Sequence, residues 1–214
     1  MFEEKIQLIK IQTQSYKENS LKIFATSSFQ TNSVALLHII SQIDKEIPIY
    51  FLNTGYHFPE TLFFKSELTK QFSLNVIDLF PQVSKIQQRD SHGKLMFASD
   101  PDYCCYLNKV QPLEQIKSEY DVWISGIRSD QSEVRKKKSV EESEDGLISY
   151  HPILDWTSKM VYQYLNHYEL PRHPLEEKGY FSIGCQPCTQ KYFDGFSDRM
   201  GRWKGLNKTE CGLH

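Results

Sequence analysis

Short apolar runs rich in β-branched residues alternate, along the first part of the chain, with longer stretches that have a helical period. The apolar runs occupy residues 21–28, 47–54, 74–80 and 121–127, and the helical stretches lie near residues 33–44, 57–72 and 108–120. Such alternation is typical of a parallel sheet whose crossover helices lie on its faces. The pattern therefore predicts an α/β fold, with a mostly parallel sheet and helices on both faces.

Three further segments complete the expected fold. The apolar run at residues 147–154 predicts an additional strand at the edge of the sheet. Residues 157–169 place apolar side chains on one helical face, which predicts a helix packed on the core with Thr157 as its N-cap. The charged run at residues 135–146 has no apolar period and predicts a mobile surface loop. Because no repeat, low-complexity tract or clear linker interrupts the pattern, we expect a single α/β domain over residues 1–214.

Composition and charge narrow the class of protein. The chain has 214 residues, of which 39% are hydrophobic and 24% charged, which suffices for a buried core. Its formal net charge of −2 creates no overall field that would favour nucleic acid or an anionic membrane, so an anion site must be local. The first residues, MFEEKIQLIKIQ, carry acids where a signal peptide carries bases, and no apolar span reaches membrane length. We expect a cytoplasmic protein with reduced cysteines and with no nucleic-acid or membrane partner.

The segments that follow the predicted strands are candidates for a binding site, because ligands of open parallel sheets bind beyond the carboxyl ends of the strands. Residues 26–33, 53–61 and 126–132 are rich in hydroxyls, glycine or backbone donors. The first of these segments opens directly into a helix, whose N–H groups suit a phosphate, although serine and asparagine also cap helices that bind nothing. Arg128 follows an apolar strand, and its guanidinium matches phosphate or sulfate oxygens; a surface salt bridge is the alternative.

Four of the five cysteines form two close pairs, Cys104 with Cys105 and Cys185 with Cys188. Two such pairs from distant parts of a chain can make one four-thiolate metal site. Neighbouring side chains diverge, so adjacent cysteines share a centre only if the backbone bends or if the centre is several atoms wide. This favours an iron–sulfur cluster over a single zinc ion. The other interpretation is that the cysteines are small apolar residues of a hydrophobic core. This interpretation is less favoured, because the CxxC follows Gly184 and contains Pro187, which are typical of a turn.

The fifth cysteine, Cys211, lies three residues from the end of the sequence, beside charged residues and away from large apolar ones. A terminus is a poor place for a residue whose role is core packing. Its position therefore indicates a chemical role for the thiol.

A set of motifs resembles the assimilatory adenylyl-sulfate reductases over roughly residues 21–214. The motifs are SSF before a helix, NTGYHFPET, CC followed by NKVQPL, GIRSDQS, HPILDWT, LPRHPLEEKGYFSIGCQPCT, GRWKG and KTECGLH. The cysteine pairs separate this branch from the phosphoadenylyl-sulfate reductases, which share the fold and the ECGLH end. The resemblance implies an adenine-nucleotide α-hydrolase-like (PP-loop) fold. In one departure, residues 29–32 read FQTN where the superfamily often has glycine and an acid, so the nucleotide contacts of that loop do not follow from the resemblance.

The same resemblance implies an activity and a set of site residues. It implies reduction of adenosine 5′-phosphosulfate to sulfite and AMP, with Cys211 attacking sulfur to form an S-sulfocysteine that thioredoxin or a similar dithiol protein resolves. Roughly residues 199–214 would form a mobile catalytic tail. Cys104, Cys105, Cys185 and Cys188 would bind one 4Fe-4S cluster. The substrate-binding positions would be Ser27, Ser28, Phe29, Lys109, Gly126, Arg128, Arg199 and Arg202.

Other functions remain open at this point. The substrate of the same chemistry could be the 3′-phosphorylated nucleotide, alone or as well. A tRNA-thiolating enzyme of related fold would also be cysteine-rich, but the sequence pI of about 6.4 and the lack of a basic stripe oppose it. A zinc-stabilised nucleotide-binding or regulatory module would use the paired cysteines for structure alone. A sulfotransferase-like or nucleotide-hydrolysing role would not need Cys211.

Overall fold

The computed structural model describes residues 2–191, 202, 212 and 213. Its strands form a six-stranded sheet in the order β3–β2–β1–β4–β6–β5. Neighbouring strands are parallel except for β5 and β6, so the predicted mostly parallel sheet is confirmed. The strands are β1 Ile23–Thr26, β2 Ile49–Leu52, β3 Val76–Leu79, β4 Val122–Ser125, β5 Glu141–Glu144 and β6 Leu147–Tyr150.

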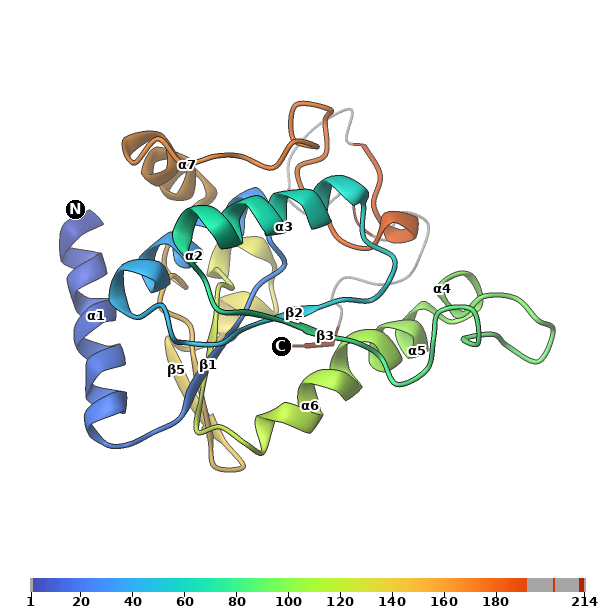
Figure 1. Ribbon diagram of the computed structural model, residues 1–214, viewed down its shortest axis with the longest axis horizontal. Helices are drawn as coiled ribbons and strands as arrows, with labels where there is room; N and C mark the ends of the chain where they lie inside the picture. The colour runs from blue at the N-terminus through green and yellow to red at the C-terminus, as the bar shows by residue number, and fades with distance from the viewer. Residues whose placement is uncertain (1, 192–201, 203–211, 214) are drawn as a thin grey trace.

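Helices lie on both faces of this sheet, as predicted (Figure 1). A π-helical segment, η1, joins α5 to α6 without a break. In the part of the chain that the structure describes, no helix has the length and apolar character that a membrane crossing requires. The α-helices are α1 Phe2–Glu18, α2 Thr31–Ile43, α3 Pro59–Phe72, α4 Met96–Ser99, α5 Pro101–Cys105, α6 Gln111–Lys117 and α7 Ser158–His167; the shorter segments are η1 Tyr106–Val110, η2 Ser129–Gln131, η3 Arg135–Lys137 and η4 Gln186–Cys188.

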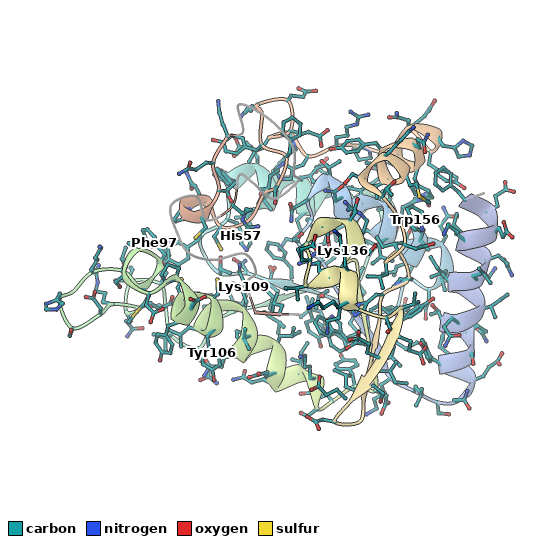
Figure 2. The ribbon with its side chains drawn as sticks, turned by 180° about the vertical axis from the view of Figure 1, so that it is seen from behind. His57, Phe97, Tyr106, Lys109, Lys136 and Trp156 are labelled. Carbon is teal, nitrogen blue, oxygen red and sulfur yellow. The ribbon has the colours of Figure 1, made fainter. Side chains whose placement is uncertain are left out.

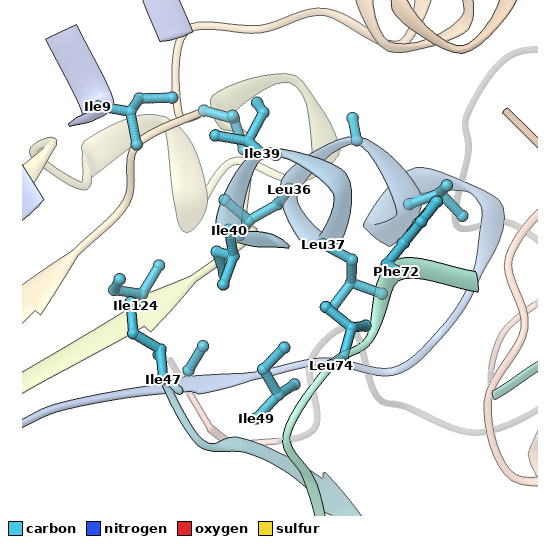
Figure 3. Packing of buried hydrophobic residues seen from close by; sticks show 14 of the residues in the cluster. Ile9, Leu36, Leu37, Ile39, Ile40, Ile47, Ile49, Phe72, Leu74 and Ile124 are labelled. Atoms are coloured by element: carbon cyan, nitrogen blue, oxygen red, sulfur yellow. The ribbon is translucent and has the colours of Figure 1, made fainter. Parts of the chain in front are cut away.

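The larger hydrophobic core lies between one face of the sheet and helices α1, α2, α3 and α7 (Figure 3). Strand residues such as Ala25, Ile49 and Ile124 point to this face and are almost fully buried. The α7 residues predicted as a helical stripe pack here, and the Thr157 hydroxyl accepts a hydrogen bond from the Met160 N–H at 3.2 Å. The predicted core helix and its N-cap are therefore confirmed.

The opposite face of the sheet carries a smaller core built around α6. Phe24, Tyr50 and Trp123 project to this side from β1, β2 and β4 and meet Leu113 of α6. Phe24 follows Ile23 and precedes Ala25, which point to the other face, as the two-residue period of a strand requires. Leu213 packs against the same cluster, which brings the last described residue onto the sheet.

Two predictions for residues 135–154 are wrong. The run 135–146 is not a loop, since it contains η3 and the antiparallel strand β5, and the strand predicted at the edge, β6, lies inside the sheet between β4 and β5. Asp145 and Gly146 form the connecting hairpin with φ of 50° and 83°. Both residues of a type I′ turn need positive φ, which Asp-Gly tolerates. The charges of β5 suit an edge strand, because charges there discourage pairing with another sheet.

The order of the strands locates the binding edge. From β1 the chain runs outward through β2 and β3, and it then returns to place β4 on the other side of β1. The carboxyl ends of β1 and β4 therefore flank a topological switch point, the usual ligand site of an open α/β sheet.

Candidate active site

A cavity of about 200 Å³ opens at this switch point. Its floor is apolar and comes from β1, β2 and α2, with Ala25, Leu36, Leu37, Ile40 and Phe51. Its rim is polar and includes three cationic side chains, Lys109, Arg135 and Arg202, and no carboxylate lines it among the described residues. The cavity is thus a local cationic site on a chain of formal net charge −2.

The loop between β1 and α2 contributes Ser27 and Ser28, two of the predicted substrate-binding residues, to the cavity. The Ser27 hydroxyl accepts a hydrogen bond from the Phe29 N–H at 3.1 Å, and Ser28 Oγ lies 3.2 Å from Ser33 Oγ. Phe29, which was also predicted to bind substrate, has its side chain fully buried in the core against Phe51 and does not line the cavity. Its φ of 53° is unusual for a bulky residue, and this turn directs the ring inward while the serines face the cavity.

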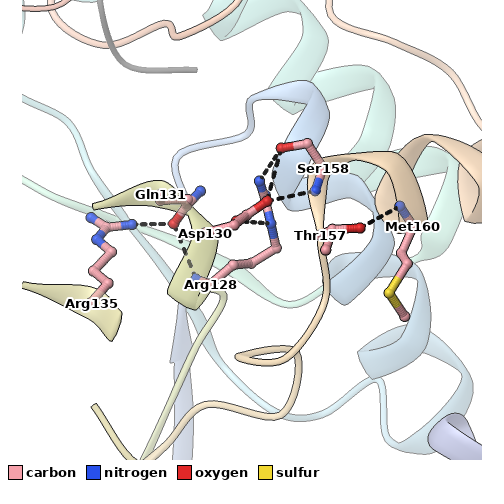
Figure 4. A network of polar contacts seen from close by, with 7 residues as sticks. All are labelled: Arg128, Asp130, Gln131, Arg135, Thr157, Ser158 and Met160. Atoms are coloured by element: carbon pink, nitrogen blue, oxygen red, sulfur yellow. Dashed lines mark hydrogen bonds and ion pairs between the residues drawn. The ribbon is translucent and has the colours of Figure 1, made fainter. Parts of the chain in front are cut away.

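Arg128 is a second predicted substrate-binding residue that does not line this cavity. Its side chain is fully buried, and its guanidinium binds Asp130 (Nε to Oδ1, 3.1 Å) and Ser158 (Nη2 to Oγ, 2.6 Å) (Figure 4). Asp130 in turn accepts the Ser158 N–H at 2.7 Å, at the start of α7. Arg128 therefore ties the η2 turn to α7 and does not line the cavity, whereas Gly126, two residues earlier, does.

The cation that β4 brings to the cavity is Arg135, which the sequence analysis did not single out. Gln131 Oε1 accepts hydrogen bonds from the Arg128 N–H at 3.1 Å and from the Arg135 guanidinium, so this amide connects the two arginines (Figure 4). Both Gln131 and Arg135 line the cavity. The available signal was the spacing of Gln131 and Arg135 by one helical turn directly after a predicted strand.

The four paired cysteines line a second, small cavity together with Tyr56, Phe97, Asn108, Lys109 and flanking prolines. Cys104 and Cys105 end α5, whereas Cys185 directly precedes the single turn η4 and Cys188 is its last residue. Phe97 and Tyr106 lie at the end of the molecule far from α1 and Trp156, with Lys109 nearer the centre (Figure 2). The structure therefore brings the two predicted pairs together. Among the residues it describes, no group of three or more His, Cys, Asp or Glu side chains meets the geometry of a site for one metal ion.

The segment that carries Cys185 is fixed to the strand ends by hydrogen bonds. His173 is fully buried; its N–H donates to Thr31 Oγ1 at 3.0 Å, and its Nε2 lies 3.0 Å from Thr61 Oγ1. The Gln186 N–H donates to the Tyr56 carbonyl at 2.7 Å, beside the bridge between His57 and Cys185. These contacts place the CxxC next to the loop that follows β2.

The electrostatics of the cysteine cavity favour neutral thiols in the absence of a positive partner. Burial, and then the proximity of Cys105, Cys185 and Cys188, raise the pKa of the Cys104 thiol to about 12, and Lys109 opposes this. Burial is also the first cause of the raised pKa of Cys188. Four thiolates could therefore coexist here only with compensating positive charge.

Lys109 and Cys185 line both cavities, so the two sites are adjacent. His57 (Figure 2) lines the first cavity and forms an isolated bridge with Cys185. Burial lowers the pKa of its imidazole to about 4, which leaves the ring neutral near pH 7. The structure thus places Lys109 between the two cavities, and its predicted contacts with a cluster and a substrate stay predictions.

Arg202 lines the first cavity, and its predicted contact with the substrate stays a prediction. It pairs with Thr189 in an isolated bridge, and its Nη1 contacts the Ile183 carbonyl at 3.5 Å. Its guanidinium lies directly over Gly184, where a Cβ atom would come within 2.5 Å of both terminal nitrogens. Leu213 also lines the cavity. Two other predicted residues, Arg199 and Cys211, lie outside the described residues.

Comparisons with known proteins identify relatives of the whole chain. A family model described as phosphoadenosine phosphosulfate reductase domain matches residues 22–191. A Bacillus cereus (strain Q1) protein named adenosine 5′-phosphosulfate reductase is 38% identical over 203 residues, which cover 94% of this chain and 87% of that protein. A protein of the same name from Bacillus mycoides (strain KBAB4) matches with the same identity and coverage.

Two solved structures show the same fold. Phosphoadenylyl-sulfate reductase from Candida auris, in a phosphate complex, aligns with a TM-score of 0.65 at 24% identity and covers 77% of this chain and 81% of that one. Yeast FAD synthetase in complex with FAD aligns with a TM-score of 0.58 at 17% identity, covering 88% of this chain and 66% of that one. These structures confirm the expected fold class. Because the family model spans most of the sequence and the Bacillus relatives match nearly all of it, the chain belongs to the phosphoadenosine phosphosulfate reductase domain family.

Proposed function

We propose that this protein reduces adenosine 5′-phosphosulfate to sulfite and AMP, with Cys211 as the nucleophile and a thioredoxin-like dithiol protein as the reductant. The Bacillus relatives carry the name of this activity. The observation that carries the proposal is the adjacency of the two cavities: a cationic site at the strand ends shares Lys109 and Cys185 with a site lined by four cysteines. The proposal places the enzyme in the cytoplasm, where thiols stay reduced.

The first cavity suits the two parts of the substrate. The apolar floor can accept the flat adenine ring, since nucleotide pockets are mostly apolar with a few placed polar groups. Lys109, Arg135 and Arg202 on the rim can hold the phosphosulfate, because cations near an anion provide charge-assisted hydrogen bonds. Ser27 and Ser28 supply hydroxyls at the end of β1, close to the first turn of α2.

The cysteine cavity suits an iron–sulfur cluster, although zinc is the alternative. Its donors are four cysteine sulfurs, three of them on buried residues, that surround one small cavity. Among the described residues, they do not converge on the position of a single metal ion. Cys104, Cys105, Cys185 and Cys188 would each hold one iron of a 4Fe-4S cluster. When bound, the cluster supplies positive charge that keeps the four thiolates ionised beside the substrate site, while both electrons of the reaction come from thiols.

The chemistry that we propose balances with thiols alone. The Cys211 thiolate attacks the sulfonate sulfur, an S–S bond forms, and the S–O bond to AMP breaks, so AMP leaves as an anion. A thiolate of the dithiol protein then attacks the Cys211 sulfur, which releases sulfite and leaves a mixed disulfide. The second thiol of that protein breaks the mixed disulfide and restores Cys211, so the dithiol is oxidised by two electrons. Leu213, two residues after Cys211, lines the cavity where the substrate would lie.

The proposed nucleophile is tested by a single turnover. Protein mixed with adenosine 5′-phosphosulfate and no dithiol should release one equivalent of AMP and gain a sulfonate-sized mass on the peptide that contains KTECGLH. Cys211→Ser should still bind nucleotide but form no sulfite, because a serine hydroxyl supplies almost no anion at neutral pH. An adduct on another cysteine, or steady turnover by Cys211→Ser, would contradict the assignment.

The substrate and the metal need separate measurements. Sulfite release should be assayed with adenosine 5′-phosphosulfate and with its 3′-phosphorylated form, each with and without reduced thioredoxin. A preference for the 3′-phosphorylated nucleotide would replace the proposed substrate. Anaerobically purified protein should contain about four irons and four sulfides per chain, the stoichiometry of the cluster. Stoichiometric zinc without iron would exclude the cluster.

A further inference from the structure

A buried pair of amides, Gln88 and Asn108, lies beside the cysteine cavity, and the proposed chemistry assigns it no role. Gln88 belongs to the segment between β3 and α4, and Asn108 belongs to η1. Their relative exposures are only 2% and 1%. Buried side-chain amides are uncommon and costly unless they are hydrogen-bonded, so their partners indicate why they are there.

The two side chains bind each other reciprocally. Gln88 Nε2 donates to Asn108 Oδ1 at 3.0 Å, and Asn108 Nδ2 donates to Gln88 Oε1 at 2.6 Å. Gln88 Nε2 also donates to the Val83 carbonyl at 2.8 Å. This paired arrangement fixes the plane of both amides, so the remaining N–H of Asn108 has a defined direction.

That remaining N–H points at Cys104. Asn108 Nδ2 lies 2.8 Å from the Cys104 carbonyl and 3.6 Å from Cys104 Sγ, and both contacts have hydrogen-bond geometry. One amide thus contacts both the backbone and the sulfur of a proposed metal ligand. Hydrogen bonds to ligand sulfurs stabilise the thiolate and tune the metal that it binds.

Gln88 also connects Cys104 to the wall of its cavity. The Gln88 carbonyl accepts the Met96 N–H at 2.9 Å, and the next residue, Phe97, lines the cysteine cavity. The isolated bridge between Arg89 and Leu95 closes the same turn. Any movement of Gln88 would therefore move both the aromatic wall and the amide that faces Cys104.

We propose that the Gln88–Asn108 pair is a positioning device that orients the Cys104 sulfur toward the other three cysteines and retains the metal group there. The proposal rests on the proposed metal site, although it does not depend on whether iron or zinc occupies it. The pair acts through Cys104 and touches no substrate, so both amides are positioning residues.

The test is metal retention in anaerobically purified protein. The rate at which a strong chelator removes the bound metal should be measured for wild type, Asn108→Leu, Gln88→Leu and the double-leucine variant. Gln87→Leu is the control, because Gln87 is the exposed neighbour of Gln88 and its amide binds only Ser84 among the contacts described. Thermal unfolding of each variant is measured in parallel.

The double variant separates positioning from packing. Each single variant leaves a buried amide without its partner, whereas the double variant replaces both amides by apolar side chains and should regain stability. If the pair positions Cys104, Asn108→Leu and the double variant should lose metal at least about tenfold faster than wild type. Loss of a residue that hydrogen-bonds a metal ligand typically lowers metal affinity by about that factor or more. For an iron cluster, both should also have a lower midpoint potential, because the lost N–H stabilised the more negative reduced state.

The outcomes distinguish this inference from the proposed function. A double variant that is stable and keeps metal at the wild-type rate would overturn the positioning role and leave the cluster in place. Zinc without iron would overturn the cluster, while faster zinc loss from the variants would still support the pair. Wild type that binds neither metal would overturn both. Gln87→Leu should match wild type, and metal loss equal to that of Asn108→Leu would also contradict the role of the pair.

Discussion

Replacing Gly184 by alanine should weaken the reaction by displacing Arg202. The new Cβ atom would lie 2.5 Å from both terminal guanidinium nitrogens, whereas real Cβ contacts are essentially never shorter than 3.0 Å. The guanidinium must therefore withdraw by about half an ångström or more, and it can do so because it is the end of a flexible side chain. Gly184 is not among the residues with positive φ, so alanine should cause no backbone strain there.

The magnitude follows from the contacts that Arg202 can lose. A hydrogen bond to a charged group contributes about 1.5–3 kcal/mol, and it weakens as its geometry is distorted. A partial displacement should therefore cost about 1 kcal/mol, or about fivefold in kcat/KM. Arg202→Ala sets the upper limit, at about 3 kcal/mol. Thermal stability and metal content should change little, because Gly184 would gain only a methyl group at the rim of a cavity.

The assay is a double-mutant cycle in sulfite release. If Gly184 acts only by seating Arg202, the alanine at 184 should have no further effect in the Arg202→Ala background. Gly184→Ala with wild-type kcat/KM would refute the reasoning. A Gly184→Ala effect of unchanged size in the absence of the arginine would refute it as well.

Three other predictions concern charges and buried histidines. Arg128→Ala should lower the free energy of unfolding by about 2–3 kcal/mol in urea titrations, because it breaks a buried ion pair. Arg135→Ala should instead raise KM with little loss of stability. The reverse pattern would restore Arg128 as a substrate residue. Lys109→Ala should change both turnover and the visible spectrum of the bound metal, because Lys109 lines both cavities, and a variant with neither change would show that this lysine is only a surface charge. Burial lowers the pKa of His151 and His173 to about 4, against about 6.5 in the unfolded chain. The stability that the two neutral histidines contribute is therefore complete above a pH of about 6.5 and falls as the pH drops towards about 4. Urea midpoints that rise on acidification would contradict this prediction.

The inner strands β1, β2 and β4 could be predicted from sequence because each is a short apolar run that is buried on both faces. Phe24, for example, packs on one face and Ala25 on the other. The edge strand β5 escaped prediction, since its sequence EESE is polar and only the Asp-Gly turn and its pairing with β6 define it. Edge strands often lack the apolar signal that identifies inner strands.

The meeting of the two cysteine pairs could be predicted from their spacing, because two close pairs from distant parts of a chain are typical of one four-thiolate site. The roles of Arg128 and Arg135 could not be assigned in this way. Both follow β4 and both are cations, and only the fold shows that Asp130 and Ser158 hold one of them while the other lines the cavity. Gln88 and Asn108 left no signal, because a reciprocal amide pair between residues 20 positions apart has no local pattern.

The π-helical segment η1 makes the number of residues between the cysteine pair and α6 as important as their identity. Each residue of an α-helix turns the chain by about 100°, and a π segment accommodates one additional residue. Deleting one residue within Tyr106–Val110 would let a regular helix form with Cys104 and Cys105 still in the same direction relative to Leu113, whereas deleting a second residue would rotate them by about 100°. A relative could therefore lose one residue here, but a relative that lost two would have to give up either the packing of α6 on the sheet or the meeting of its four cysteines.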